Sequence, residues 1–218
     1  MYEELRVNSE ESDAIDSFNK FRYRGFDYFY EDDYDGAIKN MEKALDAIEI
    51  YLPTNVKFTL ENLSHRLFFL GFRNEILLQL GISYRKSGFY YKAKEIFEGL
   101  IHFTEEFRVG DILGFEEMIL GYHPVSRYEL LCTLWSEIGL IYKDLKLYNE
   151  ALDAFYKSTH IPKIKLFSAP CHNPWLEIAY LHEQLEDFSA AKSAKKEFKK
   201  TNKLIRKKDR RRLRWVYR

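Results

Sequence analysis

Residues 133–158, TLWSEIGLIYKDLKLYNEALDAFYKS, decide the fold of this 218-residue chain. Within this stretch, bulky rings and small residues alternate at defined distances from one another. They are Trp135, Gly139, Tyr142, Tyr148, Ala151 and Phe155. In a repeat protein, a pattern of this kind recurs along the chain.

The pattern occurs four times. Counted from an alanine, a small residue stands twelve positions before it, and rings stand nine and three positions before it. The alanines are Ala37, Ala93, Ala151 and Ala191, the small residues Gly25, Gly81, Gly139 and Ala179, and the rings Tyr28, Tyr84, Tyr142 and His182, then Tyr34, Tyr90, Tyr148 and Phe188. Four positions after the alanine come Met41, Phe97, Phe155 and, as an exception, Lys195.

Helical periodicity dominates the whole chain. Apolar residues such as Ala37, Met41 and Ala44 recur at spacings of three and four, and strand alternation is nowhere sustained. Gly, Pro and Asn mark breaks near 53–55, 87–88, 109–111, 121–124 and 162–174, which divide the chain into eight or nine helices. Asn173 followed by Pro174 predicts a helix start. The predicted fold class is all-α.

The repeated pattern resembles the tetratricopeptide repeat, a helix-turn-helix hairpin. The resemblance implies an α-α superhelix, or solenoid, in which small residues let paired helices approach and bulky ones fill the gaps between hairpins. The alanines lie 56, 58 and 40 residues apart, whereas the family's period is about 34, so helices must be lengthened or inserted. We expect a solenoid over 1–198, with units near 18–52, 74–108, 132–162 and 172–198, and a basic helix or tail over 199–218. An ordinary helical bundle is the alternative.

The composition, 46% hydrophobic, 31% charged and 17% aromatic, is that of a folded globular protein. Two cysteines, Cys132 and Cys171, are too few for a disulfide framework and indicate a reducing compartment. The N-terminal residues show no basic start followed by an apolar run, and no stretch reaches 18 uncharged apolar residues. We therefore expect a cytoplasmic protein without a transmembrane segment.

The formal net charge is zero, but the charges are divided along the chain. Residues 192–218 carry 14 basic and two acidic side chains, whereas the remainder carries 20 basic and 32 acidic ones. Such asymmetry often marks an interaction surface. The candidates for binding an anionic partner are Arg206, Lys207, Lys208, Arg210, Arg211, Arg212 and Arg214, with Trp215 available to stack on bases.

Three anionic partners fit this segment: nucleic-acid phosphate, an acidic groove of this or another copy, and an anionic lipid surface. The alternative is a capping helix, because terminal repeats need a polar outer face. Its apolar stripe would consist of Ala191, Ala194, Phe198 and Ile205.

Sequence motifs of phosphate-binding, metal-binding and catalytic sites are missing. No GxxxxGK[ST] or GxGxxG segment is present, and His182-Glu183 lacks a second histidine four positions on, where Glu186 stands. Cys171-His172, with His160 or His182, lacks a third group that would make a metal site or a catalytic set. We expect no catalytic activity, no cofactor and no metal.

The resemblance implies a concave groove lined by the first helix of each hairpin. The candidate groove residues are those that the packing positions leave free: Arg22, Tyr23, Phe26, Glu75, Gln79, Arg85, Glu137, Lys143, Glu177, Tyr180 and Glu183, flanked by Asn19, Phe29, Ser136 and Asn173. An aromatic start and an acidic end suit a peptide with an apolar anchor and basic residues. The alternative is that Phe26 and Phe29 are buried under a separate helix over 10–20. Family members that bind acidic chaperone C-termini use a basic-and-Asn clamp, of which only Asn19 and Arg22 are present, so this role is disfavoured.

These observations favour a non-catalytic adaptor that holds a peptide or helix of a partner protein. The second hypothesis is a nucleic-acid or ribonucleoprotein-associated factor that uses the basic C-terminal segment. The third is a peptide-sensing regulator, in which a ligand would change the superhelical pitch.

Overall fold

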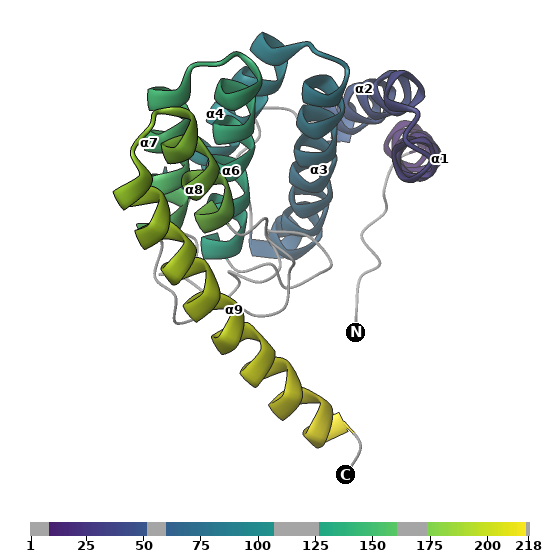
Figure 1. Cartoon of the computed structure of the whole chain (residues 1–218). Coiled ribbons are helices and arrows are strands. Elements are labelled where there is room, and N and C mark those ends of the chain that lie inside the picture. Colours follow the sequence, from purple (N-terminus) through teal and green to yellow (C-terminus); the bar gives the residue numbers. More distant parts are fainter. Residues whose placement is uncertain (1–8, 52–59, 107–126, 161–173, 217–218) are drawn as a thin grey trace. The chain divides into compact units, whose positions relative to one another are not determined.

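The computed structural model describes residues 9–51, 60–106, 127–160 and 174–216, with side chains over 12–49, 69–105, 130–159 and 174–203 (Figure 1). The described residues form eight α-helices and no strand, which confirms the all-α fold class. The helices are α1 (Ser9–Tyr30), α2 (Tyr34–Tyr51), α3 (Leu60–Lys86), α4 (Tyr90–Glu106), α6 (Arg127–Asp144), α7 (Tyr148–His160), α8 (Pro174–Gln184) and α9 (Phe188–Val216).

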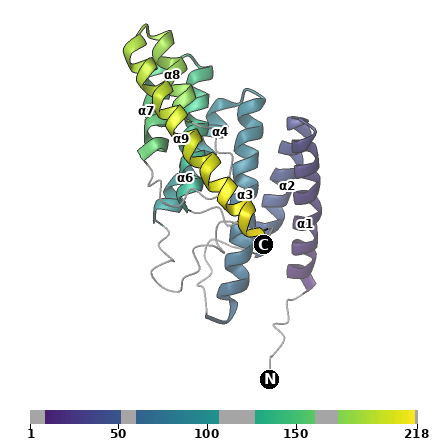
Figure 2. The ribbon, with the colours of Figure 1, turned by 60° about the horizontal axis from the view of Figure 1, so that its bottom comes forward.

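Consecutive helices pair into four hairpins: α1 with α2, α3 with α4, α6 with α7, and α8 with α9. The hairpins form two compact units, one over 1–124 and one over 125–218. Within the first unit α2 also packs against α3, and within the second α7 packs against α8. Figure 2 shows α1 and α2 side by side from a second direction. Each unit is thus two stacked hairpins.

Each hairpin turns through one residue in the left-handed region, which ends the first helix. These residues are Asp32 (φ 59°), Gly88 (φ 82°), Lys146 (φ 60°) and Glu186 (φ 60°), each five positions before its repeat alanine. In the third hairpin, the N–H of Lys146 donates to the carbonyl of Lys143 at 3.0 Å, and the N–H of Leu147 donates to the carbonyl of Tyr142 at 2.9 Å. The other three turns have the same pair of hydrogen bonds. One turn geometry therefore builds all four hairpins.

The two helices of a hairpin meet where the sequence pattern predicts. A Cβ added at Gly25 would lie 2.8 Å from Met41 Cγ, and one added at Gly139 would lie 2.9 Å from the Phe155 ring. A Cβ added at Gly81 would collide with the Phe97 ring. The glycine twelve positions before the alanine thus makes room for the bulky residue four positions after it.

The fourth hairpin departs from this pairing in both positions. Ala179 replaces the glycine, and Lys195 replaces the bulky residue. Lys195 is exposed and its Nζ forms an ion pair with the Glu183 carboxylate. Because no ring lies between the helices, the extra methyl group of Ala179 is accommodated.

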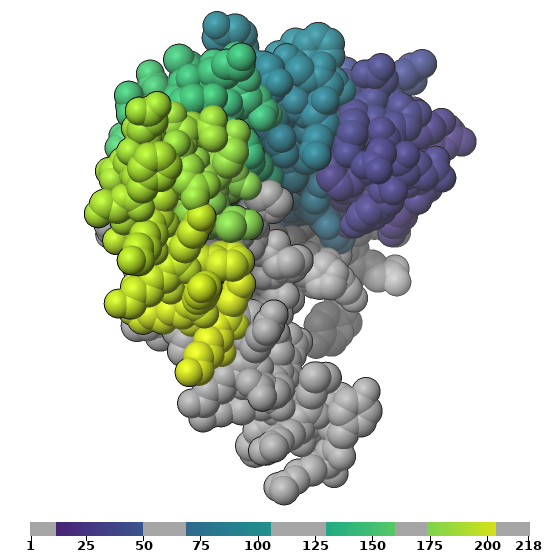
Figure 3. Space-filling model, in the orientation of Figure 1, coloured from purple at the N-terminus to yellow at the C-terminus, as the bar shows by residue number. Residues whose placement is uncertain are grey.

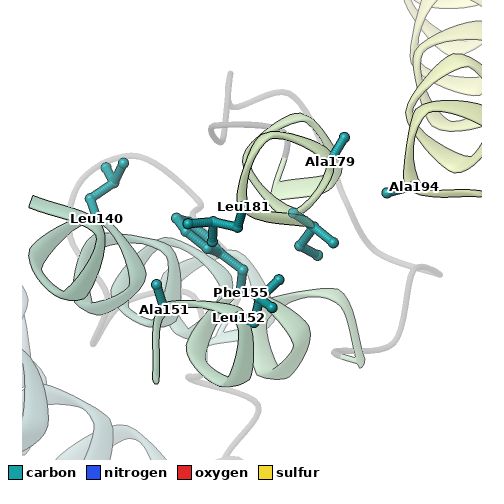
Figure 4. Close-up of a cluster of buried hydrophobic side chains, with 8 residues drawn as sticks. Leu140, Ala151, Leu152, Phe155, Ala179, Leu181 and Ala194 are labelled. Carbon is teal, nitrogen blue, oxygen red and sulfur yellow. The ribbon is translucent and has the colours of Figure 1, made fainter. Parts of the chain in front are cut away.

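The buried core of the second unit draws on all four of its helices (Figure 4). Its members are Leu140, Ala151, Leu152, Phe155, Ile178, Ala179, Leu181 and Ala194. Tyr142, Tyr148, Tyr156 and Trp175 are partly buried against this cluster. Burial of these apolar side chains, at roughly 25 cal/mol for each Å² removed from water, is what holds the hairpins together.

A hydrogen bond also joins the two hairpins of each unit. In both units it links the residue five positions after one repeat alanine to the residue nine positions before the next. The Tyr84 hydroxyl of α3 donates to the Glu42 carboxylate of α2, and the Tyr156 hydroxyl of α7 lies 3.0 Å from His182 Nε2 of α8. Burial raises the pKa of Tyr84 well above its usual value, and its hydrogen bond to Glu42 raises the pKa further. Burial also raises the pKa of Tyr156, with a smaller contribution from the negative charge of Asp187.

Two helices run across boundaries that the sequence predicted. Residues 10–20 do not form a separate helix, because α1 runs unbroken from Ser9 to Tyr30 and carries Phe26 and Phe29 itself. The prediction that a separate helix buries those two rings is therefore wrong. Residues 199–216 continue the second helix of the fourth hairpin, since α9 is one helix from Phe188 to Val216.

The predicted helix start at Pro174 is confirmed, since Pro174 is the first residue of α8. The predicted breaks at 53–55, 109–111 and 121–124 lie outside the described residues, as does most of 162–174. No helix in the described part of the chain is both long and apolar enough to cross a membrane.

Candidate functional site

The candidate groove residues lie on the first helix of each hairpin, α1, α3, α6 and α8. They recur 18, 14 to 15, 11 and 8 positions before the repeat alanine, spacings that keep them on one side of a helix. We call this side of the four helices the first-helix face. Each unit contributes two of these helices.

Arg22 and Glu75 form an ion pair that joins α1 to α3 in the first unit. Arg22 Nη2 lies 3.0 Å from Glu75 Oε2, and the Arg22 side chain is only 10% exposed. The guanidinium lies 3.9 Å from the centroid of the Phe72 ring. Arg22 is therefore a buried contact between hairpins whose charge Glu75 neutralises.

Aromatic side chains surround this ion pair. The rings of Tyr23 and Phe26 each lie 5.4 Å from the Arg22 guanidinium. Phe26 is half-buried, whereas Tyr23 is 60% exposed. Because Tyr23 is held by a neighbouring cation while most of its ring faces solvent, it can contact a partner at little entropic cost.

The remaining candidates of the first unit are less accessible. Gln79 is half-buried, and its Oε1 has no hydrogen-bond partner. Arg85 is half-buried near the end of α3. Asn74, which the sequence pattern did not identify, is 2% exposed with both amide atoms unpartnered.

The second unit contains a matching ion pair between α6 and α8. Lys143 Nζ lies 2.8 Å from Glu177 Oε2, and both side chains are largely buried. The same Nζ lies 5.7 Å from the centroid of the Tyr180 ring, which is 45% exposed. In both units, therefore, a cation of one hairpin pairs with a glutamate of the next and lies beside an exposed tyrosine.

Leu176 belongs to this face and was not among the candidates. It lies one helical turn before Tyr180 and is 51% exposed. Its repeat position is that of Arg22, fifteen before the alanine, so the register could have found it. Together Leu176 and Tyr180 form an exposed apolar pair on α8.

Glu183 and Glu137 complete the second half of the face. Glu183 pairs with Lys195 of the same hairpin, which leaves its charge partly neutralised. Glu137 is half-buried on α6. Asn173 and the side chains of the basic candidates beyond Lys203 lie outside the described residues.

No group of three or more His, Cys, Asp or Glu among the described residues is arranged to hold a metal ion. Cys132 is buried on α6. Cys171 and His172 lie outside the described residues, so the structure does not test them.

Comparison with known proteins identifies the repeat. Residues 133–161 match the sequence profile of the tetratricopeptide repeat. No curated protein sequence matches the chain.

Among solved structures, MamA (41 to the end) from Desulfovibrio magneticus RS-1 is 15% identical, with 89% of this chain and 98% of that chain covered and a TM-score of 0.31. MamA from MSR-1 is 17% identical, with 88% and 98% covered and a TM-score of 0.30. BtubC from P. vanneervenii is 12% identical, with 93% of each chain covered and a TM-score of 0.33. At such TM-scores these neighbours support no conclusion about function.

The matched segment contains most of α6 and all of α7, the two helices of the third hairpin, and the other three hairpins share its turn geometry and its repeat alanine. The first three also share the close approach of a glycine to a bulky residue. Residues 133–161 therefore form a tetratricopeptide repeat, and the other three described hairpins have the same helix-turn-helix construction.

Proposed function

We propose that this protein is a non-catalytic adaptor that binds a peptide or helix of a partner protein on the first-helix face. Tetratricopeptide repeats generally serve as protein-interaction scaffolds, which supports the adaptor class. The observation that carries the finer proposal is the pair of exposed apolar side chains on α8, Leu176 and Tyr180, beside the Lys143–Glu177 ion pair.

Rigid apolar side chains and the exclusion of water from the ion pair favour such binding. Tyrosine contributes much to interfaces because it buries a large area for the loss of few rotamers. The Lys143–Glu177 pair fixes α8 against α6, so Leu176 and Tyr180 are presented on a preorganised surface. A partner segment with an apolar anchor would cover both side chains and exclude water from the ion pair.

A cytoplasmic location accompanies this proposal. The sequence has two cysteines, Cys132 and Cys171, too few for a disulfide framework, which supports a reducing compartment.

The test is selection of binding peptides from a random phage-displayed library on the full-length protein. We expect enriched peptides with an apolar anchor, and we expect Leu176→Ala with Tyr180→Ala to weaken the best peptide about tenfold or more. The matched control is Leu185→Ala with Phe188→Ala, which removes two exposed apolar side chains from the turn between α8 and α9.

Affinity would be measured by fluorescence anisotropy, with circular dichroism to confirm the fold. Equal weakening by the two double variants would contradict the proposal, and so would a library that yields no binding peptide.

A further inference from the structure

Helix α9 is much longer than the helix it packs against. It has 29 residues, whereas α8 has 11; at a rise of 1.5 Å per residue these correspond to about 43 and about 16 Å. Of the side chains that the structure describes on α9, Ala194 is the last one buried, and Phe198 is half-buried. Figure 1 shows α9 continuing well beyond the end of α8. Packing within the fourth hairpin therefore accounts for only the first half of α9.

The described half of α9 has two distinct sides. Ala191 and Ala194 are buried against the hairpin, whereas the lysines between and after them are all exposed. Those lysines are Lys192, Lys195, Lys196, Lys199, Lys200 and Lys203. Figure 3 shows these turns of α9, in yellow, at the surface of the second unit.

The basic side extends along the rest of the helix by register. At 3.6 residues per turn, eleven basic residues lie within about half of the helix circumference. They are Lys192, Lys195, Lys196, Lys199, Lys200, Lys203, Arg206, Lys207, Arg210, Arg211 and Arg214. Beyond Lys203, the helical backbone and the residue spacing place the basic positions on this side. From first to last the basic stripe spans about 33 Å of helix axis.

We propose that this basic stripe binds the phosphate backbone of nucleic acid without regard to base sequence. Duplex nucleic acid carries one charge per roughly 1.7 Å of axis, so a stripe with one cation every few ångströms can neutralise several phosphates at once. The only acidic residues after position 191 are Glu197 and Asp209, and Glu197 pairs with Lys200. The remainder of the chain is net acidic, which repels a polyanion and confines its contact to α9.

A membrane surface fits the helix less well. A helix that lies in a lipid interface needs a continuous apolar side to enter the acyl region. In α9 the side that begins with Ala194 and Phe198 is interrupted, by register, by Asn202, Asp209 and Arg212.

The second rival is the acidic surface of another copy of the chain. The turn between α1 and α2, with the first residues of α2, exposes the carboxylates of Glu31, Asp32, Asp33 and Asp35. These few charges are compact, whereas the stripe is long, so the elongated polyanion is the better match.

The test measures binding of the full-length protein to fluorescent duplex RNA and duplex DNA between about 50 and 200 mM salt. The test variant is Lys196→Gln with Lys199→Gln and Lys203→Gln, which avoids the ion-paired Lys195 and Lys200. The matched control is Lys39→Gln with Lys86→Gln and Lys146→Gln, which removes three exposed lysines elsewhere. Circular dichroism checks that both variants are folded.

We expect the native protein to bind both duplexes, with log Kd rising linearly with log salt. The test variant should reduce that slope by roughly 0.9 for each phosphate that it no longer neutralises, and the control should leave the slope unchanged. Absence of binding at the lowest salt, or equal losses in the two variants, overturns the proposal. Binding to phosphatidylcholine–phosphatidylserine vesicles without binding to either duplex would also overturn it. The same holds if sedimentation velocity shows a self-association that the test variant abolishes, while the native protein binds neither duplex.

Discussion

At the scale of single residues, Gly139 and Gly99 show how a glycine's surroundings decide its role. Both lie inside helices, but an added Cβ would collide with the Phe155 ring at Gly139 and would meet nothing at Gly99. Alanine normally stabilises a helix interior by about 1 kcal/mol relative to glycine. Replacing a helical glycine with alanine therefore stabilises the protein only where the added methyl group has room.

We therefore predict opposite effects for one substitution at these two sites. Gly99→Ala should raise the free energy of unfolding by about 1 kcal/mol. Gly139→Ala should lower it, because overpacking typically costs about 1–3 kcal/mol and outweighs the propensity gain. Urea unfolding followed by circular dichroism measures both. A stabilising Gly139→Ala would show that the contact with Phe155 yields easily.

Lys146 occupies a backbone conformation that favours glycine. Its φ of 60° matches that of the turn residue Gly88 at 82°. Replacing Lys146 with glycine relieves the strain of a side chain in the left-handed region, so we predict a stabilisation of about 1 kcal/mol. Gly88→Ala should destabilise by a similar amount. Thermal melts of the two variants check these two predictions. A Lys146→Gly variant that is less stable than the native protein would contradict the first.

At the scale of helices, the Arg22–Glu75 pair fixes how α1 meets α3. Arg22 is buried against the Phe72 ring, so its charge depends on Glu75 for compensation. Removing one partner of a buried pair leaves an uncompensated charge, which is costly even when the intact pair adds little stability.

We predict that Glu75→Gln destabilises the protein by about 1–3 kcal/mol, below the full cost for a buried pair because Glu75 is 31% exposed. The control is Glu98→Gln, which breaks the exposed pair with Lys94 on α4 and should cost no more than about 0.5 kcal/mol. Denaturant titration compares them. Equal costs would mean that water already solvates the Arg22 guanidinium.

The hydrogen bond from Tyr84 to Glu42 links α3 to α2 and makes stability depend on alkaline pH. Burial and this hydrogen bond raise the pKa of Tyr84 in the folded state above its ordinary value of 10.0. Below pH 10 both states hold the proton. As pH rises above 10, the unfolded chain releases it first, so stability present at lower pH is lost.

We predict a loss that approaches about 1.4 kcal/mol per pH unit above pH 10 from this single proton. Tyr84→Phe should remove that portion of the slope while lowering stability at neutral pH through the lost hydrogen bond. Tyr91→Phe, at an exposed site, controls for the loss of one phenol. Unfolding free energies measured between pH 9 and 11 provide the comparison, and identical slopes in all three proteins would contradict the prediction.

At the scale of the whole molecule, the chain separates two kinds of surface. The first-helix face carries ion pairs beside exposed tyrosines, whereas α9 carries exposed charges of one sign. The first suits an apolar anchor with matching polar groups. The second suits a polyanion. We therefore expect the proposed peptide binding and the proposed nucleic-acid binding to be separable by substitutions on different helices.

Much of the fold could be predicted from residue spacing. Ala37, Ala93, Ala151 and Ala191 mark the hairpins, and the glycine twelve positions earlier meets the bulky residue four positions later in the first three. These contacts are local in sequence, since a short turn fixes how two adjacent helices align. For that reason the pattern alone determined the helical hairpins and their register.

Contacts between hairpins were decided only by the tertiary structure. Arg22 lies 53 residues from Glu75, and Lys143 lies 34 residues from Glu177. No helical period relates such positions, because the stagger between hairpins depends on how whole helices pack. The sequence therefore marked these four charges as free groove residues, whereas packing pairs them.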